Sequence, residues 1–131
     1  MTQPPAGSGL RMARPFDSTA PDGTPVVQRP AVPDDEREAV VRYLRQAPIV
    51  LAARSLDPDL MDPRRPSSVP LTYHTDGTWI WPGAVGYYLQ THGVPPEPDL
   101  VAHIRAAGFR LPEVSEDARK DAVTAITSSS R

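Results

Sequence analysis

The three histidines are one group of residues whose chemistry could serve catalysis or metal binding. His74, His92 and His103 lie far apart, and their spacing matches no zinc-binding motif. His74 stands two residues before Asp76, so the two could form an acid–base pair, but an aspartate followed by glycine is more typical of a turn. We therefore expect structural or surface histidines and assign no catalytic residue.

A cluster of aspartates is the second group with possible chemistry. Asp57, Asp59 and Asp62 lie close together, and hard cations bind several carboxylates at once. An EF-hand loop would also need a glycine and a terminal glutamate, which this stretch lacks. Each Asp-Pro pair is more typical of a turn. The sequence therefore predicts neither a metal ion nor a cofactor.

Other catalytic signatures are missing from the sequence. There is no cysteine, which excludes a thiol nucleophile, a disulfide and a thiolate metal site. There is also no Gly-rich phosphate loop, no His-Glu-x-x-His and no Gly-x-Ser-x-Gly motif. These absences favour a binding protein over an enzyme.

Two tryptophans belong to the stretch that organises the chain. Asp76-Gly77 between alternating large residues predicts a two-residue type I′ turn, with strands at about 69–75 and 78–81. In that register Thr75 pairs with Thr78 and the hairpin has two faces. One face carries Leu71, Tyr73 and Ile80. The other carries the candidate binding residues Thr72, His74, Trp79 and Trp81.

The tryptophan face has two interpretations, core or binding surface. If helices cover only the Ile80 face, Trp79 and Trp81 remain free to bind a partner, as aromatic residues often do at interfaces. If both faces are covered, the indoles are core. A two-stranded hairpin is not stable alone, so at least one face must be covered.

The remaining elements complete an α+β fold. We predict a small antiparallel sheet centred on the 69–81 hairpin and packed with three or four helices. The apolar run 49–53 predicts a buried third strand, with a helical turn as the alternative. Helical spacing and capping signals predict helices at about 35–46, 82–93, 98–107 and, more weakly, 115–126.

Composition divides the chain into three parts. Of the 17 prolines, seven lie in residues 1–33, where apolar residues have no period. We predict a disordered tail there, with a docking arm as the alternative. Residues 34–112 are predicted to form the single domain, and residues 113–131 a weak helix with a frayed end.

Net charge and hydropathy narrow the classes of partner. The formal net charge of −2 predicts no general attraction to nucleic acid or to anionic membranes. There is no apolar run long enough for a membrane helix and no apolar signal-peptide core, so we expect a cytoplasmic protein. The expected partner is another protein, and the sequence does not indicate an oligomeric state.

The residues around the hairpin resemble a known group of proteins. The segments 75–82 (TDGTWIWP), 84–89 (AVGYYL) and 92–93 (HG) resemble a family of small conserved bacterial proteins, some of them similar to immunity proteins encoded beside secreted toxins. The resemblance covers about residues 36–109 and implies a binding role without a catalytic residue. The resulting hypothesis is a non-enzymatic, immunity-like interaction module. The alternative is a small enzyme or ligand-binding protein with a pocket near His74, Trp79 and Trp81.

Overall fold

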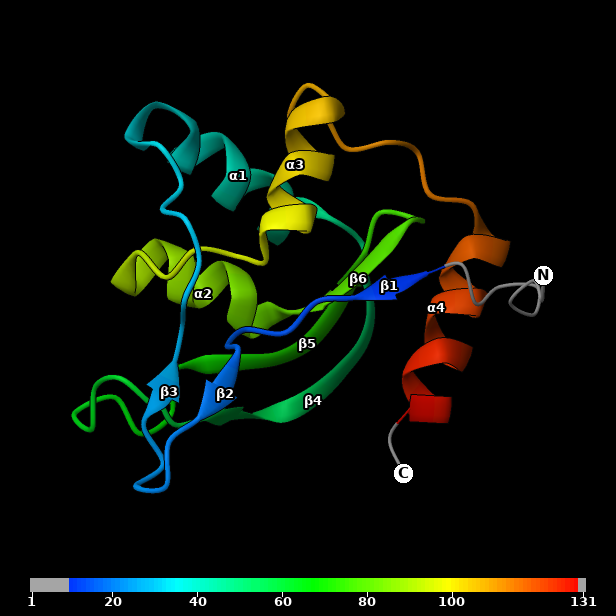
Figure 1. Ribbon diagram of the computed structural model, residues 1–131. Helices are drawn as coiled ribbons and strands as arrows, with labels where there is room; N and C mark the ends of the chain where they lie inside the picture. The colour runs from blue at the N-terminus through cyan, green and yellow to red at the C-terminus, as the bar shows by residue number, and fades with distance from the viewer. Residues whose placement is uncertain (1–9, 130–131) are drawn as a thin grey trace, which may run out of the picture.

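A four-stranded mixed sheet lies at the centre of the computed structural model, which describes residues 10–129 (Figure 1). Its strand order is β1-β6-β5-β4, with β1 parallel to β6 and the other pairs antiparallel. The strands are β1 (Arg11–Met12), β4 (Ile49–Asp57), β5 (Val69–Thr75) and β6 (Trp79–Pro82). A separate two-stranded ribbon is formed by β2 (Ser18–Thr19) and β3 (Pro25–Val26). The helices are α1 (Asp34–Gln46), α2 (Gly83–His92), α3 (Pro98–Ala106) and α4 (Glu116–Ser129). The predicted α+β class is confirmed.

The β5–β6 hairpin has a longer connection than the Asp-Gly turn predicted. Thr75 pairs with Ile80 and His74 with Trp81, so the register differs from the predicted one by two residues. The cause is the Asp76 side chain, whose Oδ1 accepts the backbone N–H groups of both Thr78 and Trp79. Because a shift of two residues preserves the alternation of side chains, the predicted division into two faces still holds.

Helices cover the tryptophan face of the sheet. Trp79 and Trp81 are 3% and 0% exposed and pack with residues of α1, α2 and α3. The Trp81 indole N–H donates to the Leu44 carbonyl at 2.8 Å, and its ring packs against Tyr43. The question that the sequence left open is thereby answered: the two indoles are core residues.

The opposite face of the sheet packs against α4. Ile80 is fully buried with Ala122 and Ile126 of that helix, and Leu10 and Met12 join the same cluster. Because α4 lies over only part of this face, Tyr73 and its neighbours remain partly exposed. The segment predicted as a weak helix is therefore part of the fold, and it extends three residues beyond the predicted end.

Local sequence signals account for the boundaries of α2 and α4. Pro82 precedes α2, and Gly93 ends it in the left-handed conformation with φ 71°. A Cβ atom at Gly83 would collide with the Thr72 hydroxyl, so this glycine allows α2 to begin directly against β5. Ser115 caps α4 by accepting the Ala118 N–H at 3.1 Å.

The predicted strand at 49–53 is confirmed but differs in length and burial. β4 runs to Asp57 and pairs only with β5 in the described part of the chain, which makes it an edge strand. Ile49 is 55% exposed, so the prediction that this strand is buried is wrong. Two irregularities interrupt its pairing, one after Ile49 and one after Ala52. Such bulges are common on edge strands, where they interrupt uncontrolled pairing.

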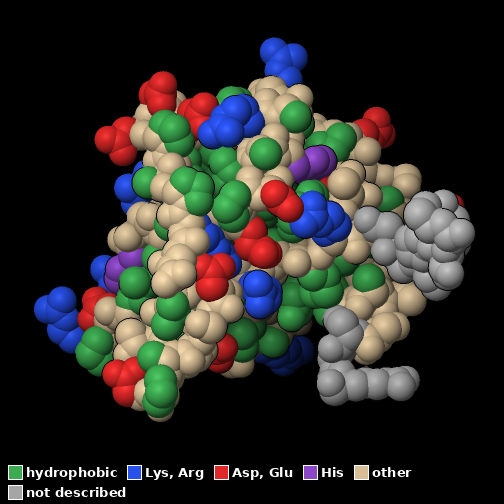
Figure 2. Space-filling view, viewed as in Figure 1, with side chains coloured by type: hydrophobic (Ala, Val, Ile, Leu, Met, Phe, Trp, Pro, Cys, Tyr) green, Lys and Arg blue, Asp and Glu red, His purple; other side chains and the backbone are tan. Residues whose placement is uncertain are grey.

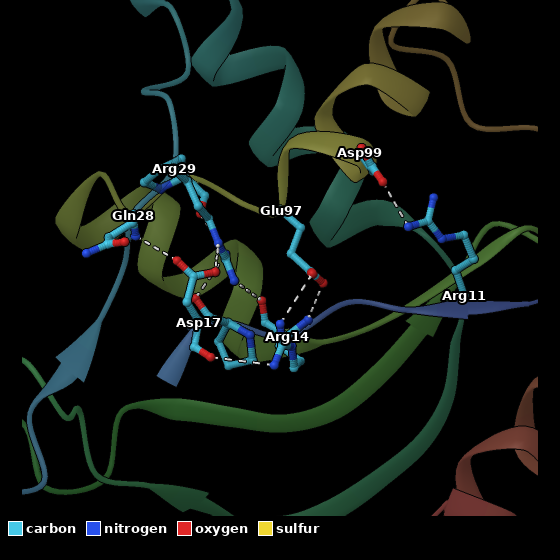
Figure 3. A network of polar contacts seen from close by, with 9 residues as sticks. Arg11, Arg14, Asp17, Gln28, Arg29, Glu97 and Asp99 are labelled. Atoms are coloured by element: carbon cyan, nitrogen blue, oxygen red, sulfur yellow. Dashed lines mark hydrogen bonds and ion pairs between the residues drawn. The ribbon is translucent and has the colours of Figure 1, made fainter. Parts of the chain in front are cut away.

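The described part of the predicted tail, residues 10–33, lies on the domain. β1 adds to the β6 edge, with Ala13 4% exposed. The Arg29 side chain is 1% exposed and bonds to Asp17 at 2.9 Å and to the carbonyls of Pro15, Arg14 and Pro95 (Figure 3). The disordered-tail prediction is wrong for these residues, because polar anchors hold them where apolar periodicity is missing. Residues 1–9 lie outside the described residues.

Two further contacts tie this N-terminal segment to α3. Arg11 forms an ion pair with Asp99 at 2.9 Å, and its guanidinium lies 4.3 Å from the Trp79 ring centroid. The Arg14 backbone N–H donates to Glu97 at 2.8 Å (Figure 3). The segment thus closes the β6 side of the sheet, while the β4 side remains open.

Candidate functional site

Large exposed hydrophobic side chains gather in one short stretch of the described residues. They are Ile49, Leu56, Leu60 and Met61, with exposed fractions of 55%, 48%, 54% and 44%. Elsewhere between residues 10 and 129, the large apolar side chains are buried or half-buried. Single exposed apolar residues need no explanation, but a group on one strand and its following loop marks a candidate interaction site.

The loop that carries Leu60 and Met61 is pinned by a buried carboxylate. Asp59 Oδ2 accepts the Tyr87 hydroxyl at 2.7 Å and His92 Nε2–H at 2.6 Å, both from α2. Its Oδ1 accepts the Met61 backbone N–H at 2.8 Å. The Asp59 side chain is fully buried, so one carboxylate joins the loop to the helix.

A second contact and the loop's own backbone complete this anchoring. The Leu60 N–H donates to the Tyr88 hydroxyl at 2.9 Å, one residue along α2 from Tyr87. The Asp59 N–H donates to the Arg65 carbonyl at 2.9 Å, which closes the loop on itself. The two apolar side chains are therefore held toward solvent by a fixed backbone rather than by a mobile one.

Ionised Asp59 suits these contacts. Burial acts to raise the pKa of Asp59, but the hydrogen bonds from Tyr87, His92 and the Met61 N–H outweigh it and hold the pKa below its usual 3.8. Burial and the neighbouring carboxylate raise the pKa of Tyr87, so its hydroxyl remains a donor. The aspartate that the sequence suggested as a turn residue is thus also the loop's main polar anchor.

An apolar groove of about 500 Å³ lies beside this loop, along β4 and β5. Its walls come from β4, β5, the start of α2 and the end of α4. The lining residues include Ala52, Ala53, Asp57, Val69, Leu71, Tyr73, Ala84 and Ile126. Alanines stand where larger side chains would fill the space, and Asp57 is the one charged residue in the lining.

The predicted binding residues do not form this site. His74, Trp79 and Trp81 are buried, and His74 stacks on the Trp81 ring with 6.3 Å between centroids. His74 Nδ1–H donates to the Ala47 carbonyl at 2.9 Å, so Nε2 accepts the Thr72 hydroxyl at 3.2 Å. Burial lowers the pKa of His74, which matches this neutral arrangement. Only Thr72 of the four predicted residues lines the groove.

The suggested pair of His74 with Asp76 is replaced by a different contact. Asp76 Oδ2 accepts the Tyr43 hydroxyl at 2.5 Å and His103 Nε2–H at 2.8 Å. Burial acts to raise the pKa of Asp76, but its hydrogen bonds, led by the Trp79 N–H, outweigh burial and lower it. This carboxylate thus ties the hairpin turn to α1 and α3.

The three histidines do not converge on a metal site. His92 bonds to Asp59, His103 to Asp76 and His74 to a backbone carbonyl. Within residues 10–129 there is no group of three or more histidine, cysteine, aspartate or glutamate side chains that could hold a metal ion. The described helices also include none that is long and apolar enough to cross a membrane.

Acidic and basic side chains are interspersed on the face that Figure 2 shows, so this face has no patch of a single charge.

Comparison of the chain with protein-family models, curated proteins and solved structures found no match. The candidate site therefore rests on the exposed apolar residues, which no motif in the sequence indicated. Their signal in the sequence is a leucine and a methionine placed among Asp-Pro turns, outside any helical or strand period.

Proposed function

We propose that this chain is a non-enzymatic interaction module that binds another protein through Leu56, Leu60 and Met61, hereafter the loop patch. The observation that carries the proposal is the concentration of exposed large apolar side chains in residues 49–61. Burying a side chain of this size in a partner contributes roughly 1.5–3 kcal/mol. Leu60 and Met61 are about half exposed, at 54% and 44%, so burying the rest of both side chains would supply about 1.5–3 kcal/mol, a substantial part of a modest interface.

The rigid backbone of the loop supports this role. Ordering a flexible side chain or loop on binding costs about 0.5–1.5 kcal/mol per rotamer-rich side chain. Asp59 and the Tyr88 hydroxyl already fix the backbone at Leu60 and Met61, so part of that ordering cost falls on folding instead. A pre-organised apolar loop is a common way to present the central residues of an interface.

The polar interior also supports binding over catalysis. Each histidine bonds to a partner that holds the fold together, and both buried aspartates accept several hydrogen bonds. The resemblance noted in the sequence adds a specific form of the proposal: an immunity-like cytoplasmic protein whose partner is a secreted toxin. The genes that neighbour this chain's own gene are therefore the first source of candidate partners.

Affinity capture from the native host, compared between wild type and Leu60→Asp, tests the proposal. Ser67→Asp is the matched control, because it adds the same charge to an exposed position of the same loop. For a protein captured by wild type and then purified, Leu60→Asp should weaken binding by about 30-fold or more, as at an interface hot spot of about 2 kcal/mol. Ser67→Asp should bind within about threefold of wild type. Equal binding by both variants would remove the loop patch from the interface and refute the proposal.

A further inference from the structure

We infer that the apolar groove beside β4 binds an extended segment of the partner polypeptide that carries a large apolar side chain next to a lysine or arginine. This inference rests on the proposed function and specifies the chemistry of the partner. The groove is separate from the loop patch but meets it at Asp57, which follows Leu56 in the chain and lines the groove. One partner could therefore contact both surfaces.

The size of the groove suits a short stretch of chain. Its volume of about 500 Å³ falls within the range of ligand sites, roughly 300–1,000 Å³. Its floor follows β5 from Val69 to Tyr73, and four strand steps of about 3.3 Å give about 13 Å. That length accommodates about four extended residues, two of which would direct their side chains toward the floor.

The lining explains which side chains would enter. Ala52, Ala53 and Ala84 have small side chains, so space remains between the larger walls formed by Tyr73 and Ile126. A leucine-sized side chain from a partner would supply the apolar atoms that these alanines do not. The groove is only partly enclosed, whereas a small ligand site usually encloses 70–90% of its ligand. This openness favours a polypeptide segment over a free small molecule.

Charge determines the second feature of the partner. Asp57 is the single charged residue of the lining and lies at the end of the groove near Val69, its neighbour on β5. Its carbonyl accepts the Ser68 N–H, while its carboxylate is exposed and can meet a cation. A basic side chain next to the apolar one would place its charge at this carboxylate. An acidic segment would be repelled.

The bulges of β4 determine how the segment lies. Pairing with β5 is interrupted between Ala52 and Leu56, so β4 does not present a regular ladder along its free edge. Addition of a long new strand at that edge is therefore unfavourable. The segment instead binds across the face of the sheet, through side chains that enter the groove.

A random dodecapeptide phage library selected on the full-length chain tests this inference. We expect enrichment of sequences with a large apolar residue beside lysine or arginine. Synthetic fluorescent copies of enriched peptides are then measured by anisotropy. Ala53→Phe fills the groove and should weaken binding at least tenfold, while Arg54→Phe, the neighbouring residue outside the lining, should leave it within about twofold. Leu51→Trp, at a lining residue paired with Tyr73, repeats the test if Ala53→Phe folds poorly by circular dichroism.

The charge requirement has its own measurement. Asp57→Asn should weaken basic peptides by about two- to fivefold, the effect of a single exposed charge pair, and the loss should shrink at high salt. Enrichment of acidic peptides, or binding that Ala53→Phe and Leu51→Trp leave unchanged, would overturn the inference. So would sedimentation showing a dimer that Ala53→Phe dissociates, because a second copy of the chain would then occupy the groove.

The two proposals fail separately. A captured partner that depends on Leu60 but binds Ala53→Phe normally would remove the groove from the interface and keep the loop patch. Peptides that depend on Ala53, together with a partner that is indifferent to Leu60→Asp, would keep the groove as a binding site and reject the loop patch.

Discussion

Asp59→Ala is the most direct perturbation of the candidate site, because this carboxylate accepts three hydrogen bonds that join the loop to α2 and to itself. A hydrogen bond to a charged group contributes about 1.5–3 kcal/mol, and a buried donor left without an acceptor costs about 1–3 kcal/mol. His92 is 20% exposed in its side chain, so water can replace part of its contact. Tyr87 is 7% exposed, so its hydroxyl has less access to water and bears most of the penalty. We expect a loss of about 2–4 kcal/mol in the free energy of unfolding.

The assay combines urea unfolding with amide hydrogen exchange. Exchange in residues 59–66 should accelerate well beyond the change seen in α1, because the loop loses its anchors while the core does not. Asp62→Ala is the control: this side chain bonds within the loop, to Arg64 and Arg65, and its removal should cost less than about 1 kcal/mol. The anchoring argument is refuted if Asp59→Ala and Asp62→Ala lose equal stability, or if exchange in the loop is unchanged.

Three further predictions concern the fold. Both faces of β6 are buried, so Trp81→Ala should lower the free energy of unfolding by about 3–5 kcal/mol and Ile80→Ala by about 2–5 kcal/mol. Urea titrations measure both losses, and a loss under about 1 kcal/mol for either variant would contradict this packing. Arg29→Ala should cost about 1–3 kcal/mol and expose residues 10–33 to limited proteolysis, whereas an unchanged digestion pattern would mean that the segment is held by other contacts. Stability, measured by urea midpoints, should fall in two stages as the pH is lowered. His74 has a lowered pKa in the folded state, so it stabilises the fold above about pH 6.5 and this contribution is lost below that pH. The pKa of Asp76 is also lowered, so its contribution is lost below about pH 3.8. In His74→Gln the first stage should disappear, and its persistence would assign it to another group.

The features that follow from local periodicity were predictable from the sequence. The two hairpin faces, the helix after Pro82 and the end of α2 at Gly93 depend on residues within one element, and the structure has them as expected. The hairpin register was not predictable in the same way. It depends on a side chain, because Asp76 accepts two backbone N–H groups and lengthens the turn. Propensity rules describe backbone preferences and do not include such a side-chain cap.

The N-terminal segment and the candidate site depend on partners distant in the sequence. Besides its partners in the N-terminal segment, the buried Arg29 side chain donates to the Pro95 carbonyl, 66 residues later. Asp59 meets Tyr87 and His92 across about 30 residues, and no local spacing connects them. Composition predicted a disordered tail around Arg29, and the Asp-Pro pairs predicted a turn around Asp59. The sequence contained the right residue types, but their pairing arises only from the tertiary fold.

The cluster that unites Leu10 and Met12 with Ile126 has a consequence for the order of folding during synthesis. A ribosome adds about 5–20 residues per second, so on the order of ten seconds separates Met12 from Ile126. The hairpin and β4 can pair locally in that time, whereas β1 must wait for β6, and the cluster must wait for α4. The last turn of α4 therefore completes this cluster, and until then the emerging chain exposes Ile80 and its neighbours to chaperones and proteases.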